Sequence, residues 1–164
     1  MSQSNRLSKT VAQFDGLPAG LRSSAISFVL GNVVPYIGTS KLKFEELTPE
    51  RVVVSIKNRR KVQNHIHNVH AAAMALLAET ATGFCVSMNL SDDKLPLIKT
   101  LKVDYLKRTQ GDMRAVAQLR PDQIQLIRSQ DKGELTVPVT ITDETGNEPI
   151  TAEMVWAWVP KKKA

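Results

Sequence analysis

The feature of this sequence best suited to chemistry is a single carboxylate, Glu79, inside an apolar segment. From residue 69 to residue 84, the clearly polar side chains are His70, Glu79, Thr80 and Thr82. Burying a carboxylate costs free energy unless the group is paired, and burial also raises its pKa. Such a group can act near neutral pH as a general base or a nucleophile. The alternative is a helical residue that faces solvent or forms a structural salt bridge, and the pattern alone leaves both open.

The spacing between His70 and Glu79 restricts how they can cooperate. In an α-helix each residue turns by ~100° and rises by ~1.5 Å, so these side chains would point to opposite faces, about 13.5 Å apart along the axis. They cannot easily serve one site within one chain. They can serve one site across a dimer, with His70 from one subunit and Glu79 from the other.

Other residue types that could carry chemistry give weaker patterns. His65, His67 and His70 could hold a metal, but their spacing matches no standard zinc site, so we expect histidines that hydrogen-bond a loop or a ligand and no metal. Cys85 is the only cysteine, and we expect it to be an inert small hydrophobe. The sequence has no glycine-rich phosphate loop, no G-x-S-x-G and no H-E-x-x-H.

Two groups of basic residues flank the apolar segment in the sequence. Either group could hold the phosphates of a nucleotide-bearing ligand. The alternative for each residue is a solvated charged rim. The groups are Arg59, Arg60 and Lys61 before the histidines, and Lys102, Lys107 and Arg108 further along the chain.

The elements that must position these residues can be read from periodicity. The apolar segment is rich in Ala, Leu and Met, which favour helices, and a helix that is apolar nearly all round is buried on most sides. We expect a sheet to wrap around it. Pro121–Ser129 reads as a connector with one helical turn, and Pro138 suggests a bulge or an edge. A first helix is expected over 18–30, and strands over 40–47, 51–57, 97–105, 113–119, 135–141 and 150–158.

Composition bounds the class of protein. With 164 residues we expect a single domain over 1–164, with 1–10 and 160–164 flexible. The net charge of +6 favours anionic partners, but half of it comes from Lys161–Lys163, and no aromatic residues interleave with the basic ones. We therefore expect neither nucleic acid nor a membrane as partner. The lack of an apolar leader or membrane-length run, together with one cysteine, predicts a cytoplasmic protein.

The sequence resembles a known family. The run Asn64-x5-His70-x8-Glu79, followed by a strand reading VDYLKRTQGDM, is similar to hotdog-fold thioesterases of the phenylacetyl-CoA thioesterase type, in an uncharacterised bacterial branch. The resemblance covers roughly residues 18–159. It implies an α+β hotdog fold, in which a long antiparallel sheet wraps around a central helix, here with an N-terminal helix added. The element order read above agrees with it.

The resemblance implies a role for each matching position. Glu79 stands where the family has its general base or nucleophile, and Asn64 where an Asn or Gln positions the attacking water or the thioester carbonyl. His70 begins the turn whose backbone N–H polarises that carbonyl, and Ala71 would be the donor. The sequence departs from the family here, because His-Ala-Ala replaces His-Gly-Gly, but an alanine N–H can still donate.

The resemblance also implies partners. The substrate would be an acyl-CoA or acyl-carrier thioester, and no cofactor is expected beyond coenzyme A as part of the substrate. The site would lie at the interface of a homodimer, which could pair further into a tetramer. The nucleotide phosphates would be held by Arg59, Arg60, Lys107 and Arg108. The alternative function is a non-catalytic hotdog protein that binds acyl-CoA or fatty-acyl groups. A dehydratase is less favoured, because it usually has an Asp/Glu–His pair at a different spacing.

Overall fold

A computed structural model describes residues 5–162. The flexible ends expected at 1–10 and 160–164 therefore fall partly outside the described residues. Within them, Arg6–Ala12 form helix α1. Asn5 caps this helix by accepting a hydrogen bond from the Ser8 N–H at 2.7 Å, and its amide donates to the carbonyls of Ser87 and Leu90. The polar composition of this segment did not predict the helix, because its stability depends on bonds to a distant part of the chain.

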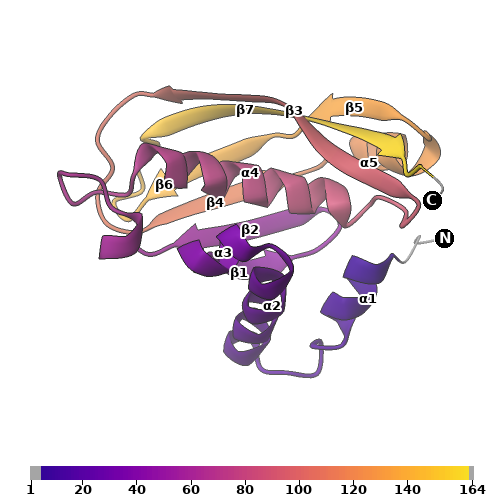
Figure 1. Cartoon of the computed structure of the whole chain (residues 1–164), viewed down its shortest axis with the longest axis horizontal. Coiled ribbons are helices and arrows are strands. Elements are labelled where there is room, and N and C mark those ends of the chain that lie inside the picture. The colour runs from indigo at the N-terminus through magenta and orange to yellow at the C-terminus, as the bar shows by residue number, and fades with distance from the viewer. Residues whose placement is uncertain (1–4, 163–164) are drawn as a thin grey trace.

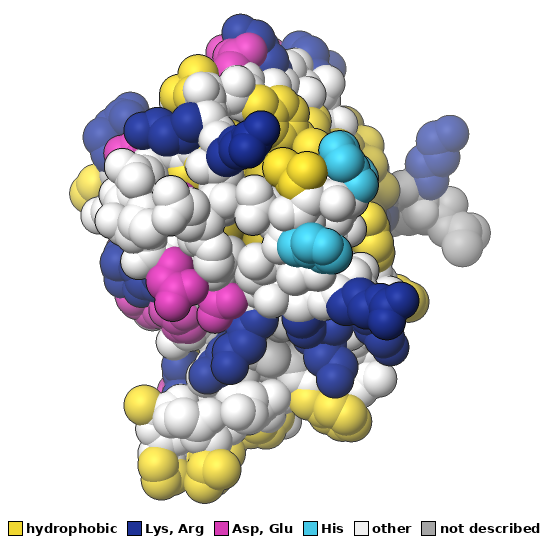
Figure 2. All heavy atoms as spheres, turned by 90° about the vertical axis from the view of Figure 1, so that its left-hand side faces the viewer, with side chains coloured by type: hydrophobic (Ala, Val, Ile, Leu, Met, Phe, Trp, Pro, Cys, Tyr) yellow, Lys and Arg dark blue, Asp and Glu magenta, His cyan; other side chains and the backbone are white. Residues whose placement is uncertain are grey.

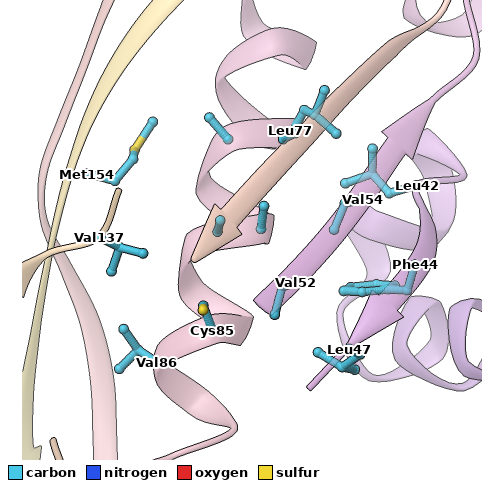
Figure 3. Close-up of a cluster of buried hydrophobic side chains, with 14 of the residues drawn as sticks. Leu42, Phe44, Leu47, Val52, Val54, Leu77, Cys85, Val86, Val137 and Met154 are labelled. Carbon is cyan, nitrogen blue, oxygen red and sulfur yellow. The ribbon is translucent and has the colours of Figure 1, made fainter. Parts of the chain in front are cut away.

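The central helix α4, Ala71–Ser87, lies inside two antiparallel sheets (Figure 1). Leu77, Ala78, Ala81 and Cys85 on this helix are completely buried. Figure 3 shows Leu77, Cys85 and Val86 among side chains from both sheets, including Val54 and Met154. This arrangement confirms the prediction of a helix wrapped by an antiparallel sheet. No helix of residues 5–162 is long and apolar enough to span a membrane.

The strands divide between the two sheets. The first sheet has the order β1-β2-β4-β6, and the second has the order β3-β7-β5. All of the paired strands are antiparallel. The strands are β1 Lys43–Leu47, β2 Arg51–Ile56, β3 Lys94–Tyr105, β4 Met113–Gln118, β5 Gly133–Thr136, β6 Val139–Asp143 and β7 Ile150–Pro160.

The single strand expected over 135–141 is wrong, because the chain divides at Pro138 into β5 and β6, which belong to different sheets. Proline has no N–H to donate and therefore interrupts a ladder. On either side of this break the backbone forms hydrogen bonds to strands of different sheets. The Val137 N–H donates to the Met154 carbonyl of β7 at 3.0 Å, and the Pro138 carbonyl accepts from the Gln118 N–H of β4 at 3.1 Å. The proline thus transfers the chain from one sheet to the other.

The remaining helices lie outside the sheets. Helices α2, Ala19–Val33, and α3, Pro35–Ser40, meet at Val34 and pack against each other, and α2 also packs against β1. The first helix, expected over 18–30, is α2, and Pro35 begins the short second helix α3, a position that suits its missing N–H. The connector expected over Pro121–Ser129 is a full nine-residue helix, α5. A short 3₁₀ helix, Arg60–Val62, leads into the histidine loop.

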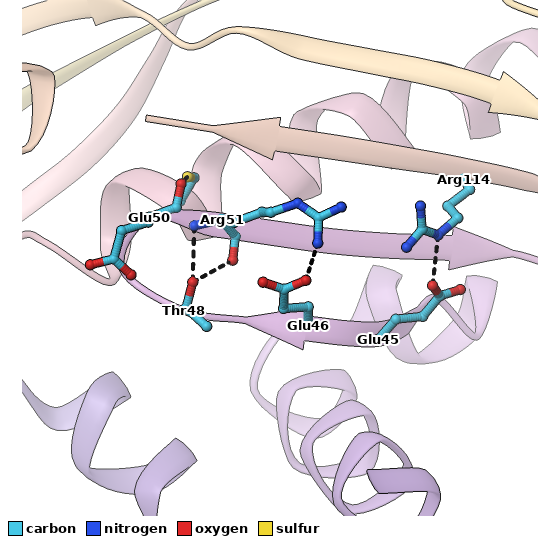
Figure 4. Close-up of polar contacts among 7 residues, drawn as sticks. Glu45, Glu46, Thr48, Glu50, Arg51 and Arg114 are labelled. Atoms are coloured by element: carbon cyan, nitrogen blue, oxygen red, sulfur yellow. Dashed lines mark hydrogen bonds and ion pairs between the residues drawn. The ribbon is translucent and has the colours of Figure 1, made fainter. Parts of the chain in front are cut away.

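The two sheets present different surfaces to solvent. The first sheet carries charged pairs, Glu45 with Arg114 at 2.7 Å and Glu46 with Arg51 (Figure 4). In the second sheet, β3 is an edge strand of 12 residues with exposed apolar side chains. Leu97 and Leu101 are each 47% exposed. A long apolar edge of this kind can pair with another chain.

Candidate functional site

Glu79 lies on the half-exposed side of α4, at a cavity of about 380 Å³. The cavity is open to solvent on one side and is bordered by α4, the β3 edge and the junction between α2 and α3. Among residues 5–162, Glu79 is the only charged side chain that lines it. The other lining residues are Val34, Ile37, Thr80, Gly83, Phe84, Ser87, Pro96, Leu97, Ile98 and Trp156.

The surroundings of Glu79 favour its protonated form. Burial raises the pKa of this carboxyl above its ordinary value of 4.5, and the neighbouring Thr80 hydroxyl offsets part of the rise. The Thr80 Oγ1 is itself buried and has no partner at hydrogen-bonding geometry, so burial dominates. Among residues 5–162, Glu79 forms no salt bridge. The structural salt bridge considered from the sequence is therefore not found in the described part of the chain.

The N-terminus of α4 has the opposite character. His70 is the N-cap, and its Nδ1 accepts a hydrogen bond from the Ala72 N–H at 3.0 Å. Ala71 is exposed, and its backbone N–H has no hydrogen-bond partner among the described residues. The Tyr105 hydroxyl of β3 donates to the Ala71 carbonyl at 2.9 Å and fixes this first turn. A free N–H at a helix N-terminus can stabilise a negatively charged oxygen.

Asn64 organises the loop before α4. Its Oδ1 accepts hydrogen bonds from the backbone N–H groups of Ile66 at 3.0 Å and Asn68 at 3.1 Å. His67 within this loop has a left-handed φ of 62°. The Asn64 side-chain amide nitrogen makes no hydrogen bond among the described residues. It is therefore the atom of Asn64 that could contact a ligand.

The structure does not bring the four predicted catalytic residues together within one chain. The Glu79 cavity is lined by none of Asn64, His70 and Ala71. His70 is the extended N-cap and lies just outside helix α4, so the helical calculation made for His70 and Glu79 does not fix the direction of its side chain. Ala71 and Glu79, which lie within the helix, are about 12 Å apart along its axis. The candidate residues therefore fall into two separate groups, called half-sites below, one at Glu79 and one at the start of α4.

The predicted phosphate-binding residues lie at the end of the molecule where α4 begins. Figure 2 views this end and shows lysine and arginine side chains around two histidine patches. Arg60, Lys107 and Arg108 are exposed and form no salt bridge within residues 5–162. Arg59 is different, since its Nη2 donates to the Ser40 carbonyl at 2.5 Å and to the Thr39 carbonyl at 3.4 Å. Its guanidinium is thus engaged by the end of α3.

Other candidate groups carry no chemistry in this arrangement. Burial raises the pKa of the Cys85 thiol to about 12, so it is not a nucleophile near neutral pH. Among the described residues no group of three His, Cys, Asp or Glu is placed to hold a metal. A larger cavity of about 750 Å³ lies between α2, α3 and β1. Its lining contains no carboxylate, histidine or cysteine, so we assign the site to the cavity at Glu79.

Sequence reasoning missed most of the cavity wall. Val34 and Ile37 come from the α2–α3 junction and Trp156 from β7, and no local pattern relates them to Glu79. Gly83 is the exception, because its position in the sequence could have identified it. It follows Glu79 by one helical turn and is the only glycine in α4.

Three solved structures illustrate the likeness of this fold to known proteins. A Pseudomonas aeruginosa protein of unknown function, named a probable thioesterase, is 21% identical, covers 88% of this chain and 97% of its own, and has a TM-score of 0.75. A structural-genomics protein is 27% identical, covers 94% and 99%, and has a TM-score of 0.73. A Haemophilus influenzae thioesterase is 10% identical, covers 80% and 88%, and has a TM-score of 0.63. These likenesses confirm the predicted α+β hotdog fold.

The sequence also matches the model of a protein family. The model of the family described as Domain of unknown function (DUF4442) matches residues 22–159. No curated protein matches the chain. The family match spans all of the elements that form the two half-sites.

Proposed function

The chain belongs to the DUF4442 family, and from this premise we propose that it is an acyl-CoA thioesterase. The observation that carries the proposal is Glu79, a carboxylate with a raised pKa in an otherwise uncharged cavity. The fold is also that of proteins named thioesterases. A proton acceptor beside an apolar pocket suits the hydrolysis of an acyl thioester.

The proposed reaction uses both half-sites. The Glu79 carboxylate takes a proton from water while the water oxygen bonds to the thioester carbon, or the carboxylate itself attacks that carbon. The Ala71 N–H donates to the oxyanion that forms, and the Asn64 amide orients the water or the carbonyl. In the first route the carbon–sulfur bond then breaks, and the proton held by Glu79 passes to the leaving thiolate. In the second route the carbon–sulfur bond breaks as an anhydride forms between Glu79 and the acyl group. Water then cleaves this anhydride, which releases the acid and the free Glu79 carboxylate, and one proton of that water passes to the thiolate. The products are the carboxylic acid and free coenzyme A.

The site is completed by a second copy of the chain in this proposal. Ala71 and Glu79 are about 12 Å apart along one helix, too far for both to contact one thioester carbon, so each half-site would take the other from a partner subunit. The apolar edge of β3 supplies a surface for such a homodimer. Leu97, Leu101 and Tyr105 are each about half exposed in the single chain, and pairing two such edges would cover them.

The basic end of the molecule is proposed to bind the nucleotide of coenzyme A. Arg60, Lys107 and Arg108 form no salt bridge in the described structure. Arg60 lies in the 3₁₀ helix before α4, and Lys107 and Arg108 closely follow Tyr105, whose hydroxyl bonds to the Ala71 carbonyl. Phosphate groups form charge-assisted hydrogen bonds with such side chains. Arg59 would act indirectly, since it holds the end of α3.

Hydrolysis of a panel of aliphatic and aromatic acyl-CoA thioesters tests the proposal. Glu79→Gln and Glu79→Ala should each lower kcat/KM by about 10²–10⁴-fold, the usual effect of losing a general base. Glu153→Gln, which alters an exposed glutamate on β7, is the matched control and should leave kcat/KM unchanged. Full turnover by both Glu79 variants, with folding verified by circular dichroism, would refute the role of this carboxylate.

A second candidate is a non-catalytic protein that binds acyl-CoA. It is favoured by the hydrogen bonds of His70 Nδ1 and Asn64 Oδ1. Both atoms accept backbone N–H groups and hold the loop and the helix cap, a structural role that needs no catalysis. It predicts that acyl-CoA raises the melting temperature of the wild type without being hydrolysed.

A further inference from the structure

We propose that the cavity beside Glu79 binds a straight, uncharged acyl chain, and that Val34, at the junction of α2 and α3, sets the chain length. This inference rests on the proposed function, because Glu79 marks where the thioester carbon lies. It adds the class of acyl group and the element that selects it. Val34, Glu79 and Ile98 all line this cavity.

The lining restricts the chemistry of the acyl group. Apart from Glu79, Thr80 and Ser87, the cavity is lined by apolar side chains and one glycine. A second carboxylate on the acyl group would be repelled by Glu79, and a polar acyl group would lose its hydrogen bonds to water without replacement. The volume of about 380 Å³ is in the lower part of the ~300–1,000 Å³ range of ligand sites, which suits one slender chain.

One side of the cavity is rigid. A Cβ placed on Gly83 would lie 2.6 Å from the Trp156 ring, so the ring rests directly on the α4 backbone, one turn beyond Glu79. The Trp156 Nε1 donates to the Thr82 Oγ1 at 2.9 Å, which fixes the ring in this position. Phe84 packs edge-on against Phe44, with ring centroids 4.8 Å apart. These contacts prevent the α4 side from yielding to a longer chain.

The opposite side is formed by a sharp junction between two helices. Val34 is extended, with φ −117° and ψ 95°, and it ends α2 and precedes α3. The helices approach closely at two glycines, since a Cβ on Gly38 would lie 2.5 Å from the Gly31 carbonyl oxygen. Val34 and Ile37, at this junction, line the same cavity as Glu79. Ile37 is only 2% exposed, whereas Val34 is 37% exposed and can be replaced with less damage to the core.

Chain-length profiles of position 34 variants test the proposal. Hydrolysis is measured for a straight-chain series from acetyl-CoA to hexadecanoyl-CoA. In the wild type kcat/KM should rise about fourfold per added methylene until the cavity is full, and then fall. Val34→Phe should move the optimum to shorter chains and lower kcat/KM for the wild-type optimum by about tenfold. Val34→Ala should move the optimum to longer chains.

Position 33 provides the matched control. Val33 is adjacent, 71% exposed and absent from the cavity wall. Val33→Phe and Val33→Ala should keep the wild-type profile. Identical profiles for all four variants would overturn the role of Val34. A wild type that prefers dicarboxylic acyl groups would overturn the uncharged acyl chain. Either result would leave the thioesterase proposal intact.

A binding measurement separates this inference from the proposed reaction. Glu79→Gln, with and without Val34→Phe, is titrated with octanoyl-CoA and dodecanoyl-CoA by calorimetry. If the wild type hydrolyses no thioester, yet Val34→Phe weakens dodecanoyl-CoA binding more than octanoyl-CoA binding, the reaction is wrong and the pocket stands. Absence of both hydrolysis and chain-dependent binding would overturn both.

Discussion

The beginning and the middle of helix α4 differ in almost every physical property, although they belong to one rigid element. At Ala71 the helix is exposed, offers a free backbone N–H and lies at a basic end of the molecule. At Glu79 it is enclosed by apolar side chains and carries a carboxylate with a raised pKa. The first environment suits a developing negative charge, and the second suits a proton acceptor. In the proposed function the two environments are complementary halves of one site, joined by a second copy of the chain.

The strongest test of the half-site at the start of α4 removes one hydrogen-bond donor, the Ala71 N–H. Ala71→Pro deletes the N–H at the first helical position, where proline is favoured, and His70 already has the extended ψ of 145° that a residue before proline adopts. We expect a folded protein whose kcat falls by about 10²–10³-fold. Ala71→Gly keeps the N–H and should retain activity. A wild-type kcat for Ala71→Pro would remove this N–H from the mechanism.

Mixed dimers test whether the halves come from different subunits. Glu79→Gln and Ala71→Pro chains are co-expressed with different tags, and the isolated mixed dimer should recover up to about half of wild-type activity, because it has one intact site of two. The two variants alone should stay inactive, and activity is measured on the doubly tagged dimer. Lack of recovery in an isolated mixed dimer would mean that each site is built within one chain.

The basic residues near the start of α4 should affect substrate binding more than the rate of the chemical step. The double substitution of Lys107 and Arg108 by glutamate should raise KM for an acyl-CoA about tenfold, equivalent to ~1.4 kcal/mol, with little change in kcat. The matching acyl-pantetheine, which lacks the nucleotide phosphates, should show no such change. Lys132→Glu, an exposed site before β5, serves as the control. Equal effects on both substrates would exclude phosphate binding by this pair.

The smallest expected effect concerns Glu79 and its influence on the stability of the folded protein. Because the pKa of Glu79 is raised in the folded state, ionisation of this group opposes folding. The penalty is absent below the ordinary value of 4.5, grows as pH rises through the raised pKa and persists at neutral pH. Glu79→Gln should therefore raise the melting temperature at neutral pH and not in acid. In the wild type, kcat/KM should fall as pH drops through the same pKa. A stability difference independent of pH would mean that Glu79 is not perturbed.

The sequence predicted the elements whose pattern is local. The central helix was expected over 69–84 and runs from Ala71 to Ser87, because a long apolar run of helix formers has few alternatives. The last strand alternates as expected, with Met154, Trp156 and Trp158 buried. The half-buried placement of Glu79 was visible for the same reason, since one carboxylate stands out in an apolar run. Its catalytic role stays a prediction.

What the sequence did not reveal depends on distant contacts. Pro138 indicated an interruption, but only the partners of Val137 and Gln118 show that the chain changes sheets there. The cavity wall likewise joins Val34 to Trp156 across 122 positions of the chain, which no periodicity encodes. Local propensity specifies elements, whereas the shape of a binding cavity arises from how they pack.

The burial of Cys85 has a practical consequence for following motion in this protein. Its thiol, with a pKa of about 12, should resist alkylating dyes in the folded state, and no other cysteine competes with an introduced one. A cysteine placed at Val33 could then be labelled alone, without first making a cysteine-free background. Fluorescence from that position would report in real time whether the α2–α3 junction shifts as acyl chains of increasing length enter.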